Sequence, residues 1–267
     1  MNILITGASR GLGLNHARIL SESKKNKIII TDISEGASSA FSNKDKETFN
    51  KLLKKKNIHI VYSNLIFTKD IDLVTIKIKK IFKNKIDAII CNAGGDIPGE
   101  SIKAFGNKSK INDYMISTIE FEQIYKRNFN TTFNILKKII PLMKKNKYGK
   151  IITISSVNAL LDQSNEFAYS TAKNAIIHFT KILARDLLKY NIQVNCICPG
   201  PTVTSRFLHT LKQRKKNEIN IINKNKGLGR IAQPNDISNL IEFLLSKNAE
   251  ILTGQIITAD YGYSIGK

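Results

Sequence analysis

Apolar residues recur along this chain in two different rhythms. Short runs rich in Ile and Val have the length and composition of buried strands, and we expect strands over residues 2–6, 27–31, 58–62, 87–91, 150–154, 192–197 and 255–258. Between these runs, apolar residues return every three to four positions. This spacing predicts helices over residues 11–22, 46–55, 70–82, 121–144, 166–189 and 234–245.

Strands that alternate with helices in this way form a parallel sheet covered on both faces. The pattern therefore predicts an α/β fold: one domain over residues 1–267, with a Rossmann-like doubly wound parallel sheet of seven strands. Two connections are unusually long. We interpret residues 94–120, which include Asp96, Glu100 and Lys103, as an excursion toward substrate, and residues 205–225 as a lysine-rich helical lid.

Composition narrows the class of protein. No apolar run approaches the roughly 20 residues that span a bilayer, so no membrane partner is expected. A strand that begins at residue 2 leaves no space for a secretory signal, and we expect a cytoplasmic protein. The cysteines, Cys91, Cys196 and Cys198, are too few and too scattered for a disulfide framework or a zinc site, and the four histidines form no cluster with acids. No metal is expected.

The formal net charge of +21 raises the question of a nucleic-acid partner. The lysines, however, are spread over nearly every predicted helix and turn, in company with many Asn and Ile residues. No recognisable nucleic-acid module or basic stripe with interleaved aromatic residues is present. A compositional bias explains the charge better, and no nucleic acid is expected.

A glycine-rich turn follows the first predicted strand. Gly7, Gly11 and Gly13 lie between that strand and a helix, with Ser9, Arg10 and Leu12 among them. Small residues allow the backbone to approach a pyrophosphate and to direct the free N–H groups of the helix start toward it. The turn therefore predicts a dinucleotide site.

Asp32, at the end of the second strand, indicates which dinucleotide binds. A carboxylate there can accept hydrogen bonds from the adenosine ribose and repels a 2′-phosphate, which favours NAD. Arg10 argues in the other direction, because a guanidinium could pair with that phosphate. NADP therefore stays open as an alternative to NAD.

Tyr169 and Lys173 are the candidates for chemistry. They are four residues apart on a predicted helix, so the ammonium can lie near the phenol and draw its pKa down toward the working range. Ser156 precedes Tyr169 by 13 residues, at the carboxyl end of a strand, where such sheets place their ligands. Ser155 competes for the same role, but side chains alternate along a strand and the two serines should point apart.

The glycine spacing, the segment Asn92-Ala93-Gly94, and the Ser156, Tyr169 and Lys173 set together resemble the short-chain dehydrogenase/reductase family, over nearly the whole chain. The resemblance implies that Tyr169 is the general acid/base, that Ser156 binds the substrate oxygen, and that Lys173 also binds the nicotinamide ribose. It further implies that Asn128 completes a proton relay to water. Dinucleotide contacts are implied for Gly7, Ser9, Arg10, Gly11, Leu12, Gly13, Asp32, Asn64, Leu65, Asn92, Ala93, Gly94, Tyr169, Lys173, Pro199, Gly200 and Thr204.

The family resemblance implies an NAD(P)-dependent oxidoreductase that moves a hydride between nicotinamide and a carbonyl or secondary alcohol. A reductase of 3-oxoacyl groups on a carrier protein is an alternative, since a basic surface would suit an acidic carrier. A non-catalytic cofactor-binding scaffold is another, because fold alone does not establish catalysis. The resemblance also implies a homo-oligomer, a dimer or homotetramer, formed through the helices that carry Asn128 and Tyr169.

Overall fold

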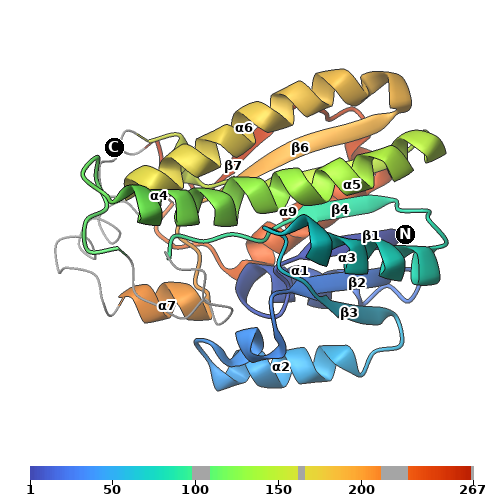
Figure 1. Ribbon diagram of the computed structural model, residues 1–267, viewed down its shortest axis with the longest axis horizontal. Helices are drawn as coiled ribbons and strands as arrows, with labels where there is room; N and C mark the ends of the chain where they lie inside the picture. The colour runs from blue at the N-terminus through green and yellow to red at the C-terminus, as the bar shows by residue number, and fades with distance from the viewer. Residues whose placement is uncertain (98–108, 162–165, 212–227, 266–267) are drawn as a thin grey trace.

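The computed structural model describes residues 1–97, 109–161, 166–211 and 228–265 (Figure 1). Its centre is a sheet of seven parallel strands in the order β3-β2-β1-β4-β5-β6-β7. The predicted fold class is confirmed, and each predicted strand is present within two residues of its expected ends. The strands are β1 Asn2–Thr6, β2 Lys27–Asp32, β3 Ile58–Tyr62, β4 Ala88–Cys91, β5 Gly149–Ile154, β6 Ile192–Pro199 and β7 Ile256–Ala259.

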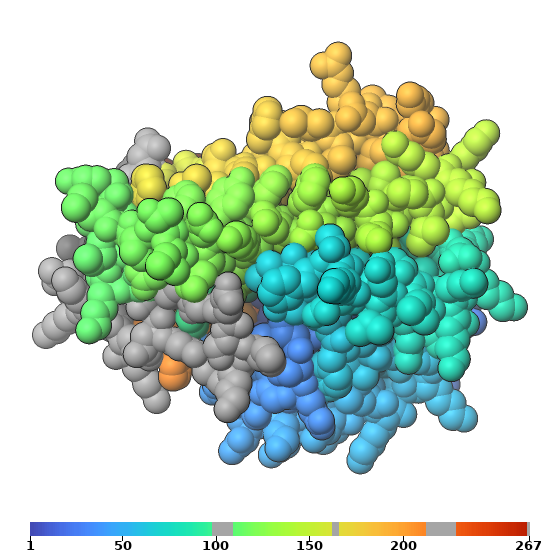
Figure 2. Space-filling view, viewed as in Figure 1, coloured from blue at the N-terminus to red at the C-terminus, as the bar shows by residue number. Residues whose placement is uncertain are grey.

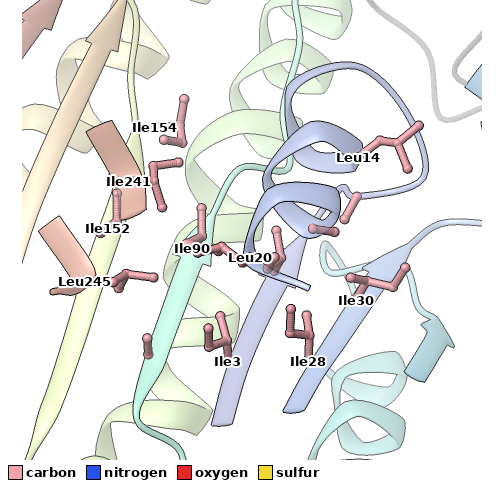
Figure 3. Close-up of a cluster of buried hydrophobic side chains, with 14 of the residues drawn as sticks. Ile3, Leu14, Leu20, Ile28, Ile30, Ile90, Ile152, Ile154, Ile241 and Leu245 are labelled. Atoms are coloured by element: carbon pink, nitrogen blue, oxygen red, sulfur yellow. The ribbon is translucent and has the colours of Figure 1, made fainter. Parts of the chain in front are cut away.

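Helices cover both faces of the sheet (Figure 1). Alternate strand residues point to opposite sides, so Ile3 and Ile5 pack in one hydrophobic cluster and Leu4 packs in the other. Figure 3 shows the first cluster, in which α1 and α9 meet the sheet. The main helices are α1 Gly11–Leu20, α2 Asn43–Leu53, α3 Thr68–Phe82, α4 Thr118–Tyr125, α5 Thr131–Asn146, α6 Phe167–Leu187, α7 Ser205–Leu211 and α9 Pro234–Leu245. None of the helices in the described ranges is long and apolar enough to cross a membrane.

The prediction of a single helix over residues 121–144 is wrong. The helical region begins earlier, with α4, and a π-helical turn, Lys126–Asn130, separates α4 from α5. Two side chains take carbonyls inside this region: the Asn128 amide donates to the Ile124 oxygen, and the Thr131 hydroxyl donates to the Arg127 oxygen, both at 2.8 Å. Such competition for backbone acceptors accompanies a local widening of a helix.

The order of the strands predicts which edge of the sheet binds ligands. The chain reverses direction across the sheet between β1 and β4, and open α/β sheets bind ligands at the carboxyl ends of the strands beside such a reversal. The glycine turn follows β1 at this edge, and Asn92 follows β4. Ser155 and Ser156 follow β5, the neighbour of β4, so the predicted site residues converge here.

Candidate active site

The glycine turn has a backbone that only glycine accommodates easily. Gly7 and Gly11 have φ angles of 64° and 55°, in the left-handed region. A Cβ on Gly13 would lie 2.2 Å from the Gly7 carbonyl oxygen, so helix α1 starts directly against the turn. This leaves a cradle of bare backbone at the first turn of α1, which fits the pyrophosphate of a dinucleotide. The Leu12 side chain is partly buried and packs against the hydrophobic core rather than into this cradle.

Asn92 and Thr6 hold the end of β4 against this turn. The Asn92 amide donates to the Gly7 carbonyl at 3.0 Å, and the Thr6 hydroxyl accepts from the backbone N–H groups of Asn92 and Ala93, both at 3.0 Å. A Cβ on Gly7 would lie 2.8 Å from the Ala93 Cα. The two segments that the family resemblance assigns to the cofactor are therefore in contact with each other.

Asp32 is bonded to the turn as well. One carboxylate oxygen accepts from the Ser9 N–H at 3.0 Å and from the Ser9 hydroxyl at 2.5 Å, and the other accepts from the Ile33 N–H at 2.8 Å. A carboxylate has about four acceptor positions, so one stays available to a ribose hydroxyl. The sequence did not reveal the link to Ser9.

Arg10 lies beside Asp32 but bonds elsewhere. Its guanidinium donates to the Ala37 carbonyl at 2.8 Å and stacks over the Phe41 ring, 5.0 Å from the centroid. Burial lowers the pKa of Arg10, and attraction to Asp32 and Asp45 opposes this shift.

Asn64 and Leu65 follow β3 and are held locally. The Asn64 side-chain oxygen accepts from the Ile66 N–H at 3.1 Å, and the Leu65 side chain is buried in the core. The Leu65 carbonyl accepts from Asn134 on α5 at 3.1 Å. Any contact with adenine would therefore come from the backbone of this loop or from the second lone pair of the Asn64 oxygen.

Helix α6 brings Tyr169 and Lys173 to the end of β5. The Lys173 ammonium donates to the Ile154 carbonyl at 2.8 Å and lies 5.6 Å from the centroid of the Tyr169 ring. The Tyr169 phenol is hydrogen-bonded to the Ser156 side chain. Ser155 points the other way, and its hydroxyl donates to the Lys173 carbonyl at 2.8 Å. Ser156, and not Ser155, therefore faces the phenol.

Electrostatics in this group differ from the expectation based on sequence. Burial raises the pKa of the Tyr169 phenol, nearby Glu166 adds to the increase, and the hydrogen bond from Ser156 opposes it. Burial lowers the pKa of Lys173 to about 8. The expectation that Lys173 draws the phenol pKa down is wrong for the protein by itself, because desolvation of the phenolate dominates.

Asn128 is fully buried and faces the loop after β4. Its amide group donates to the Gly95 carbonyl at 2.8 Å and accepts from the Gly95 N–H at 2.9 Å. A Cβ on Gly94 would lie 2.5 Å from the Asn128 side-chain oxygen and 3.1 Å from the Lys173 nitrogen. Gly94 therefore lies in the narrow space between these two side chains.

The segment after β6 closes the other side of the site. Pro199 ends β6, and the Gly200 N–H donates to Ala259 in β7 at 3.0 Å. The Thr204 side chain accepts from the Phe207 N–H at 3.2 Å and so caps helix α7, close to Gly11. Within the lid predicted over residues 205–225, the structure describes α7, and residues 212–225 lie outside the described ranges.

Sequence reasoning missed an ion pair that crosses the site. Arg206 on α7 bonds to Asp96, which follows the Gly94-Gly95 segment, and both side chains are mostly buried. Asp96 belongs to the excursion expected over residues 94–120, whereas Glu100 and Lys103 lie outside the described residues. Within the described residues, no group of three or more His, Cys, Asp or Glu side chains could hold a metal ion.

Known proteins are similar to this chain over nearly its whole length. A family model described as enoyl-(acyl carrier protein) reductase matches residues 7–264. The chain is 33% identical to a 3-oxoacyl-(acyl-carrier-protein) reductase of Buchnera aphidicola, over 97% of this chain and 95% of the relative. It is 28% identical to a 7alpha-hydroxysteroid dehydrogenase of Bacteroides fragilis, over 98% of this chain and 94% of the relative.

Solved structures extend the likeness to the fold. A 3-ketoacyl-(acyl-carrier-protein) reductase of Brucella melitensis, complexed with NADH, superposes with a TM-score of 0.80 at 22% identity, covering 98% of each chain. A 7α-hydroxysteroid dehydrogenase complexed with NADH and 7-oxo glycochenodeoxycholic acid superposes with a TM-score of 0.80 at 26% identity, covering 98% of this chain and 93% of that one. By the matched family model, the curated relatives and the shared fold, this chain belongs to the short-chain dehydrogenase/reductase family.

Proposed function

We propose that this chain is an NAD(P)-dependent oxidoreductase that interconverts a carbonyl group and a secondary alcohol. The observation that carries the proposal is the hydrogen bond between Ser156 and Tyr169, with the Lys173 ammonium behind the phenol, at the same sheet edge as the glycine cradle. A bare scaffold has no chemical need for this set. When bound, the nicotinamide supplies or accepts the hydride.

The protein groups divide the remaining work. The hydroxyls of Ser156 and Tyr169 can both reach one substrate oxygen, because they are hydrogen-bonded to each other. The raised pKa of Tyr169 keeps its phenol protonated at neutral pH, so it is ready to donate a proton to a carbonyl oxygen during reduction. Lys173 stabilises the phenolate that remains after this proton transfer. Asn128 holds the Gly94-Gly95 loop, which lies between the Asn128 and Lys173 side chains.

We propose NAD as the preferred dinucleotide. Asp32, preorganised by Ser9, would accept a ribose hydroxyl and repel a 2′-phosphate. Arg10 is already occupied by Ala37 and Phe41, which weakens the case for NADP. The proposed contacts come from the glycine turn, the loops after β3 and β4, and the segment from Pro199 to Thr204.

We propose that the protein is cytoplasmic. We also propose that the excursion over residues 94–120 and the lid over residues 205–225, both within the single domain, contact the substrate.

A reductase of 3-oxoacyl carrier proteins is the second candidate, because the names of several relatives state this activity. An assay of NADH oxidation with a 3-oxoacyl thioester as substrate separates the 3-oxoacyl reductase from a reductase of small soluble carbonyl compounds.

We also propose a homo-oligomer, a dimer or tetramer. Aromatic rings form a continuous row across α4, α5 and α6, with successive centroids 5.5–6.2 Å apart: Phe121, Tyr125, Phe129, Phe133 and Phe179. Phe133 on α5 and Ile182 on α6 are 40% and 44% exposed, on helices that lie along one face of the molecule (Figure 2). Light scattering of the purified protein tests this proposal, and a monomer at micromolar concentration would contradict it.

The catalytic proposal is tested by Tyr169→Phe, which removes only the phenolic oxygen. We expect NADH oxidation with a panel of carbonyl compounds to fall by about 100-fold or more, while NADH affinity stays within a few-fold of the parent. Tyr190→Phe is the matched control, since Tyr190 lies in the turn that follows the other end of α6. Equal turnover in the two variants would contradict the role of Tyr169.

A further inference from the structure

The ion pair between Arg206 and Asp96 connects two segments that are 110 residues apart in sequence. Arg206 is on the described part of the lid, and Asp96 is on the described part of the excursion. Their side chains are 21% and 12% exposed. A surface ion pair of flexible side chains contributes little, but a pair shielded to this degree holds a defined position.

That position is beside the proposed reaction centre. A Cβ on Gly95 would lie 2.2 Å from an Arg206 terminal nitrogen, so the guanidinium rests directly on the Gly95 backbone. Asn128 binds both polar groups of Gly95, and the preceding Gly94 abuts the Lys173 ammonium. One residue of backbone therefore separates the guanidinium from the group that supports Tyr169.

Arg206 interacts with other charged side chains at this edge of the sheet. Burial, together with repulsion from Arg10, lowers the pKa of Arg206 to about 9. Arg127 is also repelled by Arg10 and donates to the Ile97 carbonyl. Asp32 and Asp45 attract Arg10, whereas Asp96 is bonded to one terminal nitrogen of Arg206. A ligand oxyanion would be held by the guanidinium donors that Asp96 does not use.

We propose that Arg206 is a specificity-determining residue that binds a carboxylate or phosphate group of the carbonyl substrate, with Asp96 orienting the guanidinium. A guanidinium has five donors in a planar fork, so it can hold Asp96 on one edge and a ligand oxyanion on another. The inference rests on the proposed oxidoreductase function and adds the substrate class, an anionic oxo compound. The pyrophosphate of the dinucleotide has the same chemistry, and Arg206 is near enough to Arg10 of the glycine turn to be repelled by it. The contact of the guanidinium with Gly95, next to the Gly94 that abuts Lys173, is what favours the substrate as its ligand.

The test compares an oxo acid with its methyl ester, which has the same carbonyl but no charge. Each is titrated calorimetrically into the protein saturated with NAD⁺, which blocks reduction, and each is assayed separately by NADH oxidation. The variants are Arg206→Gln, the neutral double variant Arg206→Gln with Asp96→Asn, and Arg18→Gln as control. Arg18 forms an exposed pair with Glu22 and loses the same charge outside the site. The double variant serves if Arg206→Gln alone fails to fold with Asp96 unpaired.

We expect the parent and Arg18→Gln to bind and reduce the acid at least tenfold better than the ester. Both Arg206 variants should lose about 10- to 100-fold in affinity and kcat/KM for the acid, with little change for the ester. NADH affinity is followed by its fluorescence, which is free of tryptophan background because the chain has no Trp. It should stay within threefold of the parent.

Three results would overturn the inference: an acid preference that persists without Arg206, no acid preference in the parent, or a loss of NADH affinity that assigns Arg206 to the dinucleotide phosphates. Failure of the proposed function has a different signature, which is that NADH binds but no compound in the panel is reduced. The calorimetric comparison of acid and ester decides the inference in that case as well.

Discussion

Adding one methyl group at Gly94 perturbs the site where it is tightest. A Cβ there would lie 2.5 Å from the Asn128 side-chain oxygen, whereas ordinary contacts begin at 3.4 Å. Asn128 or the loop must therefore move by about 0.9 Å, the difference between these distances. Asn128 is fully buried and bonded at three points, to both polar groups of Gly95 and to the Ile124 carbonyl, so it has no free space to enter.

We expect Gly94→Ala to lower kcat by about 100-fold, because a displacement of about 1 Å in a reacting constellation costs this much. Partial loss of the Asn128 hydrogen bonds should lower the free energy of unfolding by about 1–3 kcal/mol. Steady-state NADH oxidation and urea denaturation measure the two effects.

Gly36→Ala is the matched control for this change. The nearest atom to a Cβ on Gly36 is the Ser34 hydroxyl oxygen at 3.9 Å, so the added methyl group has space. We expect kcat within twofold of the parent. A Gly94→Ala enzyme with the kcat of the control would refute the claim that the packing of Gly94 against Asn128 and Lys173 sets the geometry of the site.

Three further predictions concern buried ionisable groups. Burial lowers the pKa of His16 from 6.5 to about 3, so the unfolded chain binds one more proton between these values and stability falls below pH 6.5. The loss should reach about 2 kcal/mol at pH 5 in urea denaturation, and a His16→Asn variant with the same pH dependence as the parent would contradict this. The Lys150 side chain is buried, and its ammonium donates to the Ser246 carbonyl at 2.7 Å, just beyond α9. Lys150→Met should therefore lower the free energy of unfolding by about 1–3 kcal/mol, and an unchanged midpoint of urea denaturation would contradict this. Since the Lys173 ammonium has its pKa lowered to about 8, kcat/KM for reduction should fall above pH 8, and a profile that stays level to pH 10 would disprove the role of that charge.

The sheet could be predicted because each of its strands is a short, isolated apolar run that contains two or more β-branched residues. The ends of the strands then located the glycine turn, Asp32 and Ser156 at one edge. The choice of Ser156 over Ser155 used the spacing to Tyr169 that the family resemblance implies, together with the alternation of side chains along a strand. The structure places Ser156 against Tyr169.

Features that depend on tertiary contacts could not be predicted. The π-helical turn arises because Asn128 and Thr131 take backbone carbonyls, which the apolar pattern of residues 121–144 does not report. The pairing of Arg206 with Asp96 joins segments that no local spacing relates. The pKa of Tyr169 was expected to fall, but the extent of its burial is a property of the folded chain.

The hydrogen bonds between Asp32 and Ser9 constrain how the coenzyme preference of this protein could evolve or be engineered. Replacing Asp32 with a neutral residue would make room for a 2′-phosphate. It would also leave the fully buried Ser9 hydroxyl without its hydrogen-bond acceptor. The same substitution that relaxes selectivity would therefore loosen the cradle on which either coenzyme depends. A successful switch is expected to require exchange at both positions together, so single-site routes between the two coenzymes should pass through a poorly binding enzyme.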